Sequence, residues 1–392
     1  MKYIVPINWD LKLLESIDPR YVGEFYGKLA VDPIGGGRSG YSLHDISRRK
    51  AKEYINQIHK RKLKFNYLVN ASCFANREFT KKGYSEIRKF LDWLSLSEVD
   101  SVTVASPYLV QIIKKFYDFK VAISAFARIN SIDRIRFWQD LGADSLTLSE
   151  IDLNRDFKKL RMIRRYTKLN LRLIANNSCS LHCPMESFHS NYSSHASQSF
   201  QKNISLIDYF MRFCRFRMLL NPEEIIKAGW IRPEDVKYYE DIGIDNLKLV
   251  DRRIDTQLIL KIHNAYIARE YKGNLIDLFP AFNTRNYIDS KDTLRILTKY
   301  LDPFANNIFK LKNAFKLVIN TNFRIDNRKL NNFLEYFVNN KCDFDCQSCG
   351  YCERVAKEVV ELDPDIKNVM RNYEGFFNDL ISGNIYTYLK RG

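Results

Sequence analysis

Up to Asp277 the chain alternates between short apolar runs and longer amphipathic segments. The short runs have the length and composition of buried strands, and most of the segments between them repeat apolar residues at helical spacing. The predicted strands are Tyr3–Pro6, Val22–Tyr26, Phe65–Asn70, Ser101–Ala105, Val121–Ala125, Ser145–Leu148, Leu171–Ala175 and Asn246–Val250. The predicted helices are Ser42–Lys60, Tyr84–Leu96, Pro107–Phe116, Ile132–Leu141, Arg155–Tyr166 and Asp255–Tyr271.

Eight strands with helices between them predict an α/β protein built on a TIM-type (β/α)8 barrel over residues 1–277. An open doubly wound sheet is the structural rival. No GxGxxG sequence opens a helix after the first strand, which weighs against that alternative. In a barrel of this kind the functional loops follow the carboxyl ends of the strands.

Two segments depart from the alternating pattern. Residues 176–244 separate the seventh and eighth strands and form an insertion too long for a plain loop, which predicts a functional segment at the barrel mouth. Residues 278–392 are expected to form a small C-terminal extension with a Cys-rich loop at 342–352. Its predicted elements are a loop and helix at Phe279–Asn306, a strand at Phe315–Asn320, and helices at Asp326–Asn339 and Asp363–Gly392.

The chain is strongly basic, with 62 Lys and Arg against 46 Asp and Glu and a formal charge of +16. Such a field attracts an anionic partner, such as RNA, an acidic peptide or a carboxylate metabolite. The basic residues are spread along the chain rather than gathered in runs, so a biased composition explains the charge equally well. The apolar run at the N-terminus is too short for a signal peptide, and no stretch could span a bilayer. We therefore expect a cytoplasmic protein with no membrane span.

Eight cysteines in a cytoplasmic chain indicate metal binding rather than disulfide bonds. Four of them lie within eleven residues of the C-terminal extension and are called here the C-terminal cysteine run: Cys342, Cys346, Cys349 and Cys352. The CxxCxxC part of this run resembles ferredoxin-type loops, and Gly350 gives the backbone freedom to curl around sulfur. The run therefore predicts an iron–sulfur cluster. Zinc is the alternative, although structural zinc is commoner between two separated Cys pairs.

A second set of cysteines is predicted at the barrel mouth. Cys179 and Cys183 follow the seventh strand directly, and Cys214 lies on a helical pattern within the insertion. Cys73, just after the third strand, is the natural fourth ligand if the insertion arches over the mouth. Cys73 and Cys214 could also be ordinary small buried residues. The sequence thus predicts one cluster, or two if both sets bind. If only three thiolates bind at the mouth, one iron stays open to a substrate.

Two histidines lie in the insertion between Cys183 and Cys214. His189 and His195 are candidates for acid–base groups, substrate hydrogen-bond donors or a cluster ligand. A structural role for either is equally open.

Basic residues at predicted loop positions are candidate anion ligands. Arg38 follows the glycine-rich turn Gly35–Gly37, whose backbone N–H groups could bind phosphate or carboxylate. Lys248 and Arg252 lie at the end of the eighth strand, and Arg232 precedes Pro233. Guanidinium groups that converge at the rim would suit a dicarboxylate.

Three stretches of the chain resemble the collagenase-like peptidase family U32. They are NNSCSLHCPMESFHSNYSSH, WIRPEDVKYYEDIGIDNLKLVDRR and AYIAREYKGNLIDL. The resemblance implies a barrel with a cysteine-bound four-iron cluster. Several members are implicated in oxygen-independent hydroxylation of the ubiquinone ring or of RNA bases, with prephenate as the suggested donor in the RNA cases.

The resemblance also implies site residues. The family's stretch with Glu, Phe, His and Gly is matched by Glu186, Phe188 and His189, with Ser190 in place of the glycine. This adds Glu186 to the candidate catalytic residues. The family's Lys-Ile-Glu-Gly-Arg element is present as residues 248–252, which keep Lys248 and Arg252 but not the Glu and Gly.

Three functions remain open from the sequence. The first is an iron–sulfur enzyme that hydroxylates an RNA base, a peptide or a small aromatic substrate, supported by an electron donor or partner protein. The second is a peptidase, although the chain has no GxSxG or HExxH motif. The third is a non-catalytic protein in which metal staples a nucleic-acid- or partner-binding barrel.

Overall fold

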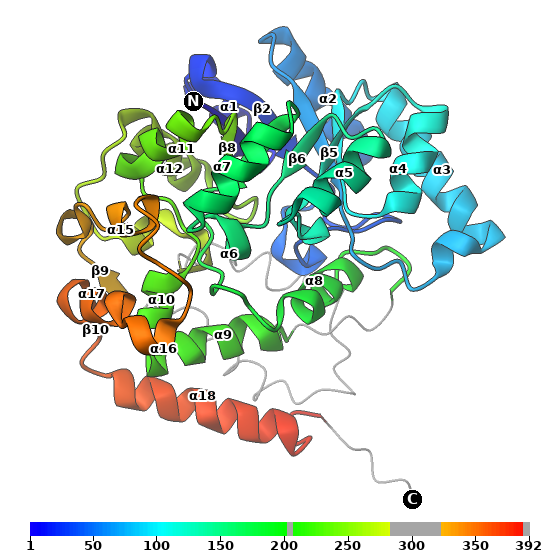
Figure 1. Cartoon of the computed structure of the whole chain (residues 1–392). Coiled ribbons are helices and arrows are strands. Elements are labelled where there is room, and N and C mark those ends of the chain that lie inside the picture. The colour runs from blue at the N-terminus through cyan, green and yellow to red at the C-terminus, as the bar shows by residue number, and fades with distance from the viewer. Residues whose placement is uncertain (202–206, 283–322, 387–392) are drawn as a thin grey trace, which may run out of the picture.

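The computed structural model describes residues 1–201, 207–282 and 323–386. Within these ranges eight parallel strands close into a barrel, each pairing with the next in sequence (Figure 1). The strands are β1 (Lys2–Pro6), β2 (Val22–Gly27), β3 (Phe65–Val69), β4 (Ser101–Val104), β5 (Lys120–Ile123), β6 (Ser145–Thr147), β7 (Asn170–Ile174) and β8 (Asn246–Lys248). The ring closes where β1 pairs with β8, with Lys2 opposite Asn246. The predicted TIM-type barrel is confirmed.

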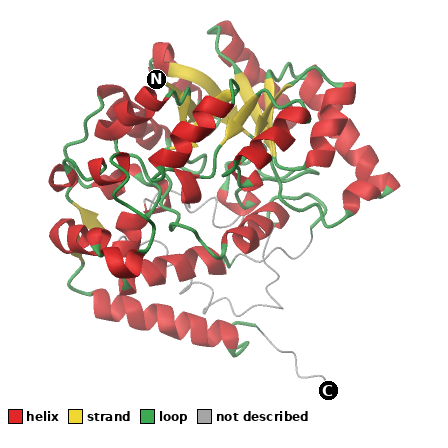
Figure 2. Cartoon of the chain, viewed as in Figure 1, coloured by secondary structure: helices red, strands yellow, loops and turns green. Residues whose placement is uncertain are grey.

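Helices surround the strands, as the red ribbons around the yellow strands in Figure 2 show. Those of the barrel are α1 (Leu11–Ser16), α2 (Arg48–Lys60), α3 (Lys81–Leu96), α4 (Pro107–Phe116), α5 (Ile132–Asp140), α6 (Glu150–Leu153), α7 (Phe157–Tyr166) and α12 (Thr256–Ala268). Each predicted helix is present. The prediction from Ser42 started too early, because α2 begins only after Ser47, whose hydroxyl caps it by accepting a hydrogen bond from the Lys50 amide at 3.3 Å.

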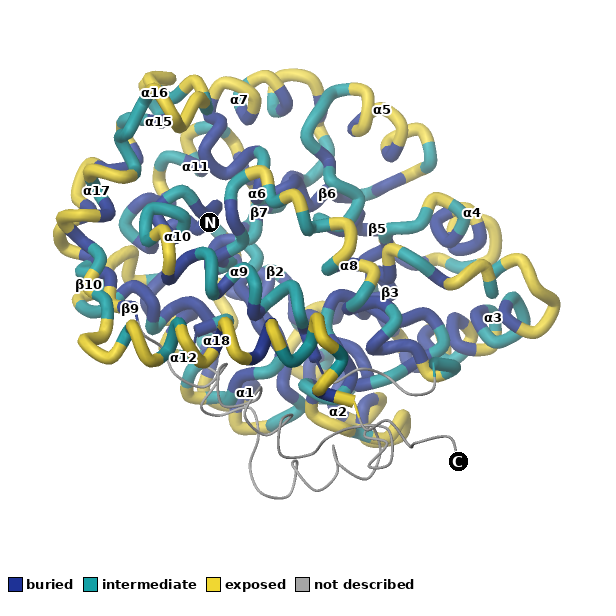
Figure 3. Tube along the Cα trace, turned by 90° about the horizontal axis from the view of Figure 1, so that it is seen from below, coloured by how far each residue is buried: buried dark blue, intermediate teal, exposed yellow. Residues whose placement is uncertain are grey.

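The insertion after β7 folds into four helices within its described part. They are α8 (Glu186–His195), α9 (Tyr209–Leu220), α10 (Glu223–Lys227) and α11 (Val236–Ile242). The residues that follow α8 contact the loop after β2. Asp32 and Gln198 form an isolated parallel β-bridge, and the Gly40 amide donates a hydrogen bond to the Ala196 carbonyl at 2.7 Å. The insertion therefore crosses the barrel mouth, and α8 and α9 lie across the face seen from below in Figure 3.

The C-terminal extension packs against this insertion. Its described elements are a two-stranded antiparallel sheet of β9 (Phe323–Ile325) and β10 (Val360–Leu362), and the helices α15 (Glu335–Val338), α16 (Cys346–Cys349), α17 (Tyr351–Val359) and α18 (Ile366–Ile381). Helix α18 runs beside α9 (Figure 1). Phe377 contacts Phe213 and Phe216 of α9 at ring-centroid distances of 5.8 and 5.6 Å. Barrel, insertion and extension thus share one apolar core.

The predictions for the extension were only partly correct. The segment predicted as one helix at Asp326–Asn339 is divided into a 3-10 turn at Asn327–Leu330 and α15. The predicted strand at Phe315–Asn320 and most of Phe279–Asn306 lie outside the described residues. No helix in the described ranges combines the length and apolar character needed to cross a membrane.

Candidate metal and anion site at the barrel mouth

A cavity of about 240 Å³ lies between the carboxyl ends of the strands and the insertion. Its walls come from the loops after β2, β6 and β7 and from helices α8 and α9. The predicted site residues that line it are Arg38, Cys179, Cys183, Glu186, His189 and Cys214. Residues placed here from four separate parts of the sequence therefore share one enclosed space.

Three thiols are brought together in this cavity. Cys179 and Cys183 are carried by the loop after β7, and Cys214 by α9. The Ser180 hydroxyl lies 3.6 Å from the Cys214 sulfur, and the Asn177 amide donates to the Cys179 sulfur at 3.2 Å. Burial raises the pKa of all three thiols, and for Cys179 the neighbouring Glu150, Cys214 and Cys183 raise it further. Three partly buried thiols that lie this close together are soft ligands that could hold iron once deprotonated.

The fourth expected ligand lies apart from these three. Cys73 follows β3, but it is not among the residues that line the cavity. Its carbonyl accepts a hydrogen bond from the Gln198 side chain at 2.7 Å, and its sulfur accepts one from the Ala75 amide at 3.4 Å. The structure therefore supplies three thiols at the mouth and leaves Cys73 in the contact between the β3 loop and the insertion.

Within the described ranges, no three His, Cys, Asp or Glu side chains converge closely enough to hold a single metal ion. A four-iron cluster has a wider requirement, because each thiolate binds a different iron atom. The cavity and the spread of its three thiols fit that larger group better than one tetrahedral ion.

His189 and Glu186 both project from α8 into the cavity. The His189 Nε2 atom lies 3.2 Å from a carboxylate oxygen of Asp208, the residue that caps α9. Burial alone would raise the pKa of Asp208, but the charge and hydrogen bond of His189 outweigh it and lower that pKa to about 2. Glu186 pairs with Arg128 at 2.9 Å, and burial raises its pKa. The pair His189–Asp208 can hold and release a proton beside the thiols.

His195 has a different place. It ends α8, and its Nδ1 atom lies 3.0 Å from the Gln198 side-chain oxygen. It does not line the cavity. The structure thus gives His195 a part in anchoring the end of the helix.

Cations gather beneath the cavity. Arg38 and Arg253 both pair with the buried Asp251, at 2.8 and 2.7 Å. The two arginines hold the pKa of that carboxyl far below its usual range, against the effect of burial. Arg38 lies within electrostatic reach of Cys179 on one side and of Lys248 and Arg252 on the other. Arg38 therefore lies between the cavity thiols and the cations of the barrel interior.

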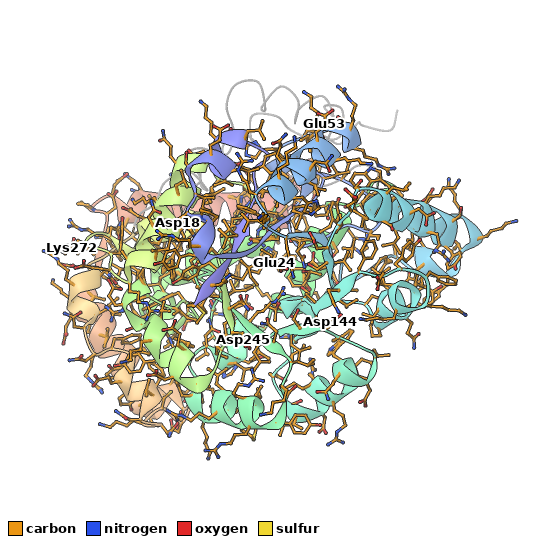
Figure 4. All side chains as sticks on the ribbon, turned by 90° about the horizontal axis from the view of Figure 1, so that it is seen from above. Asp18, Glu24, Glu53, Asp144, Asp245 and Lys272 are labelled. Atoms are coloured by element: carbon orange, nitrogen blue, oxygen red, sulfur yellow. The ribbon has the colours of Figure 1, made fainter. Side chains whose placement is uncertain are left out.

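The cations of that interior are Lys248, which is half-buried, and Arg252, which is buried. No residue in the described part of the chain accepts a hydrogen bond from either side chain, and the Arg252 Nη1 atom is fully shielded from solvent. The Lys248 ammonium instead lies 4.0 Å from the centre of the Tyr26 ring. Burial and the charges of Arg172 and Arg252 lower the pKa of Lys248 to about 7. Glu24, labelled near the middle of the barrel in Figure 4, is already paired with Arg172 at 2.7 Å.

Positive charge therefore exceeds negative charge in this region. Charge removed from water without a counterion is costly, so such an excess of cations would suit an anionic ligand. The cations are Lys28, Arg38, Arg172, Lys248, Arg252 and Arg253, and the carboxylates paired with them are Glu24, Asp32 and Asp251.

Two further candidate anion ligands, Arg232 and the glycine-rich turn, are occupied by contacts within the protein. Arg232 is buried away from the cavity, where it pairs with Asp235 at 2.9 Å and donates to the Asn327 carbonyl at 3.1 Å. The amides of Gly35 and Gly36 donate to Asp32 and Ser197 side chains, so they are not offered to a ligand. Gly35 has φ of +86°, and a Cβ there would lie 2.7 Å from the Ser194 carbonyl oxygen. These glycines allow close packing of the insertion.

The C-terminal cysteine run lies on α16, on α17 and in the loop before them. Gly350, with φ of +59°, separates the two helices. Burial raises the pKa of Cys352 to about 12, and the neighbouring Cys346 and Cys342 add to this against the attraction of Arg155. The Cys349 sulfur lies 3.2 Å from the Tyr336 hydroxyl. The four thiols are therefore close neighbours, as their spacing predicted.

Sequence reasoning missed two cavity residues. Asp208 precedes a helical pattern and could be identified as a helix cap, but its partner His189 lies on α8, a helix that the sequence did not predict. Glu150, which accepts a hydrogen bond from Asn177 at 2.9 Å, lies in a short turn of helix after β6. Its only sequence signal was its position after a predicted strand.

Comparison with known proteins agrees with this picture. Residues 38–199 match the model of peptidase family U32. The chain is 28% identical over 329 residues to the uncharacterized protease MJ1657 of Methanocaldococcus jannaschii, which covers 84% of this chain and 86% of that protein. Among solved structures, that of the U32 peptidase Mk0906 aligns with a TM-score of 0.48 and 22% identity, over 63% of this chain and 91% of that one. The resemblance to peptidase family U32 found in the sequence is confirmed over residues 38–199 and by the relative from Methanocaldococcus jannaschii.

Proposed function

We propose that this chain is an enzyme that uses an iron–sulfur cluster at the barrel mouth to hydroxylate its substrate without molecular oxygen. The observation that carries the proposal is the meeting of three partly buried thiols, a His–Asp pair and the cation Arg38 around one cavity, with Lys248 and Arg252 close to Arg38. Cys179, Cys183 and Cys214 would hold the cluster. When bound, such a cluster supplies one-electron transfer and, where a thiolate is lacking, an iron open to a ligand.

The side chains around the cluster have separate tasks. Arg38, Lys248 and Arg252 would bind the anionic part of a substrate or co-substrate, for which prephenate is the candidate that the family resemblance suggests. Whether the hydroxyl group comes from water or, at the same oxidation level, from a co-substrate such as prephenate, converting a C–H bond to C–OH removes two electrons and releases the proton of the C–H bond. His189, held by Asp208, is placed to take a proton. The electrons require an external acceptor, which is the expected role of a redox partner protein.

The substrate class follows from the same features. An RNA base, a peptide or a small aromatic molecule would enter a cavity whose apolar walls include Phe126 and Phe210. The net charge of +16 favours a substrate or carrier that is itself anionic.

The names of the relatives suggest a peptidase, and the His189–Asp208 pair could serve one. A peptidase of that kind needs a nucleophile activated by the histidine. In the described part of the chain, no serine or cysteine side chain is hydrogen-bonded to His189. The cavity thiols have raised rather than lowered pKa values, the opposite of an activated nucleophile. These observations favour the iron–sulfur function.

The test is anaerobic purification of the full chain, followed by iron and sulfide analysis and by visible and paramagnetic-resonance spectra. The proposal expects a brown protein from which Cys179→Ala removes one cluster. RNA and small aromatic pools from cells with and without the protein are then compared by mass spectrometry for an added oxygen. Cleavage of peptides by metal-free protein, with no effect of Cys179→Ala on that cleavage, would instead establish a peptidase.

A further inference from the structure

Arg155 is a buried arginine that neither the fold nor the barrel site explains. It lies between α6 and α7 and is only 2% exposed. One nitrogen, Nη2, donates to the Ala228 carbonyl at 3.1 Å. The Nε and Nη1 atoms find no hydrogen-bond acceptor in the described part of the chain. Buried charged donors without acceptors are costly, so this arginine requires an explanation.

Aromatic rings account for part of its surroundings. The guanidinium carbon lies 4.3 Å from the centre of the Trp230 ring, 5.1 Å from that of Phe333 and 5.4 Å from that of Phe337. Such contacts favour a cation, but they accept no conventional hydrogen bond. They also place the guanidinium at the contact between the barrel and the C-terminal extension, because Phe333 and Phe337 belong to the extension.

A carboxylate counterion is absent among the residues that the structure describes. The nearby Asp235 is held by both Nε and Nη2 of Arg232, at 2.9 Å each. The Tyr239 hydroxyl lies within hydrogen-bonding reach of Arg155, but it donates its own proton to the Asn154 carbonyl at 2.6 Å, and burial raises its pKa, so it supplies no negative charge. The other group in the field of Arg155 that can carry negative charge is Cys352, the last residue of the C-terminal cysteine run.

The C-terminal cysteine run has further features of a metal–thiolate centre. Its sulfurs lie in one another's field, and the Tyr336 hydroxyl reaches the Cys349 sulfur at 3.2 Å. A hydroxyl donor to a ligand sulfur is a common outer-shell contact of such centres. Lys227 adds a second cation within electrostatic reach of Cys346 and Cys352. Lys227 is already paired with Glu224 at 3.2 Å, whereas Arg155 has no carboxylate of its own among the described residues, and four thiolates around a metal would supply the missing negative charge.

We propose that the C-terminal cysteine run holds its own [4Fe-4S] cluster and that Arg155 is the buried counter-charge of that cluster. A cluster is favoured over zinc because no three of the described donors converge on a single ion, while the CxxCxxC spacing matches cluster loops. With four thiolates the centre is an anion, and the free Nε–H and Nη1–H groups of Arg155 supply donors toward it. This proposal does not depend on the function proposed for the barrel site.

The first test isolates the C-terminal centre. The full chain carrying Cys179→Ala is purified without oxygen, and iron, sulfide and zinc are measured. We expect about four iron and four sulfide per chain and, after reduction, a paramagnetic signal. Adding Cys349→Ala to that chain should remove both. One zinc per chain in a colourless protein, or no metal with the fold intact, would overturn the proposal.

The second test addresses Arg155 through a property that packing alone does not move. A nearby positive charge stabilises the reduced, more negative cluster, so Arg155→Met should shift the midpoint potential of the C-terminal centre to a more negative value. It should also speed the loss of iron to a chelator. Arg155→Lys retains the charge, so its cluster should have a midpoint potential close to that of the wild type. This variant still tests the role of the charge if Arg155→Met folds poorly.

Arg161→Met is the matched control. Arg161 also joins α7 to the extension, by donating to the Val338 carbonyl at 3.0 Å, but it has no part in the surroundings of the cysteine run. Its removal should leave the potential unchanged. An Arg155→Met protein that keeps its C-terminal cluster at the wild-type potential would show that Arg155 serves packing alone.

Discussion

His189 on α8 is joined to Asp208 at the start of α9, with 3.2 Å between the imidazole Nε2 and a carboxylate oxygen. The contact fastens the two helices that carry the cavity's histidine and its third thiol. Asp208 also caps α9 by accepting a hydrogen bond from the Met211 amide at 3.0 Å. One carboxylate thus both orients the candidate proton acceptor and fixes the helix of Cys214.

Asp208→Asn should destabilise the fold by about 2 kcal/mol at pH 7, because the variant keeps a cap but loses the charge that His189 stabilises. The folded-state pKa of Asp208 is lowered to about 2, so its contribution is complete above the unfolded value near 4. The contribution is lost as the pH falls from about 4 to about 2. Urea denaturation at pH 7 and at pH 3.5 measures the difference between the two proteins.

Asp156→Asn provides the comparison for that experiment. Asp156 also caps a helix, α7, and it pairs with a half-exposed lysine, Lys159, at 3.0 Å. A surface pair of this kind contributes little, so this variant should change stability by less than about 1 kcal/mol. Equal effects of the two substitutions would mean that the His189 contact adds nothing to the fold.

Lys248→Met should stabilise the protein while it weakens anion binding. Lys248 is a half-buried cation without a hydrogen-bond partner in the described part of the chain, and its pKa is lowered to about 7. The unfolded chain binds its proton up to a pH near 10, so wild-type stability should rise between about pH 7 and pH 10. The variant should lose that rise and gain on the order of 2–4 kcal/mol at pH 7.

Denaturation curves across this pH range, with Lys60→Met as an exposed control, measure the effect on stability. Calorimetric titration with a dicarboxylate should show weaker binding to Lys248→Met than to the control. A variant that binds the dicarboxylate as wild type does would remove Lys248 from the anion site.

His263 should make the protein less stable in mild acid. It is fully buried on α12 and neither ring nitrogen has a hydrogen-bond partner in the described ranges. Burial lowers its pKa to about 4. Between pH 6.5 and pH 4 the imidazole is therefore protonated in the unfolded chain but neutral in the folded chain. The free energy of unfolding should fall by about 3 kcal/mol over this range. His263→Leu should remove this part of the pH dependence, as judged by thermal midpoints at pH 7.5 and pH 4.5.

Iron analysis should separate Cys73 from the cavity thiols. Cys73 does not line the cavity, so Cys73→Ala is expected to retain the iron content and spectrum of the wild-type protein. Cys214→Ala should lose the iron of the barrel site. If Cys73→Ala loses as much iron as Cys214→Ala, then Cys73 is a ligand and the loop after β3 must close on the cluster when iron binds.

The barrel was predictable because its signals are local. Each strand is a short apolar run such as Ser101–Val104, and a residue at its boundary often fixes the start of the next helix, as Ser106 does for α4. The insertion was harder. Helix α8 is rich in serine and only weakly amphipathic, so its stability comes from tertiary contacts that no local pattern contains.

The sequence indicated which kinds of side chain form the site, but not which individual residues come together there. Spacing identified Cys179 and Cys183, because both lie in one loop after a strand. The choice between Cys73 and Cys214 as partners depends on which distant segment crosses the mouth, which is a property of the tertiary fold. Arg232 shows the opposite error. A basic residue beside a rim motif suggested a ligand contact, yet the nearby Asp235 is its partner.

The packing of α18 on α9 determines when this protein can be completed in the cell. The aromatic face of Phe213 and Phe216, which holds the helix of Cys214, is covered by Tyr373 and Phe377 from a segment synthesised much later. A ribosome releases the barrel strands first, and domains generally fold as their residues emerge. The nascent barrel would therefore display an uncovered aromatic face and an unseated third thiol until the final helices leave the exit tunnel. The position of the helix that carries Cys214 therefore depends on a segment that lies more than 150 residues later in the chain.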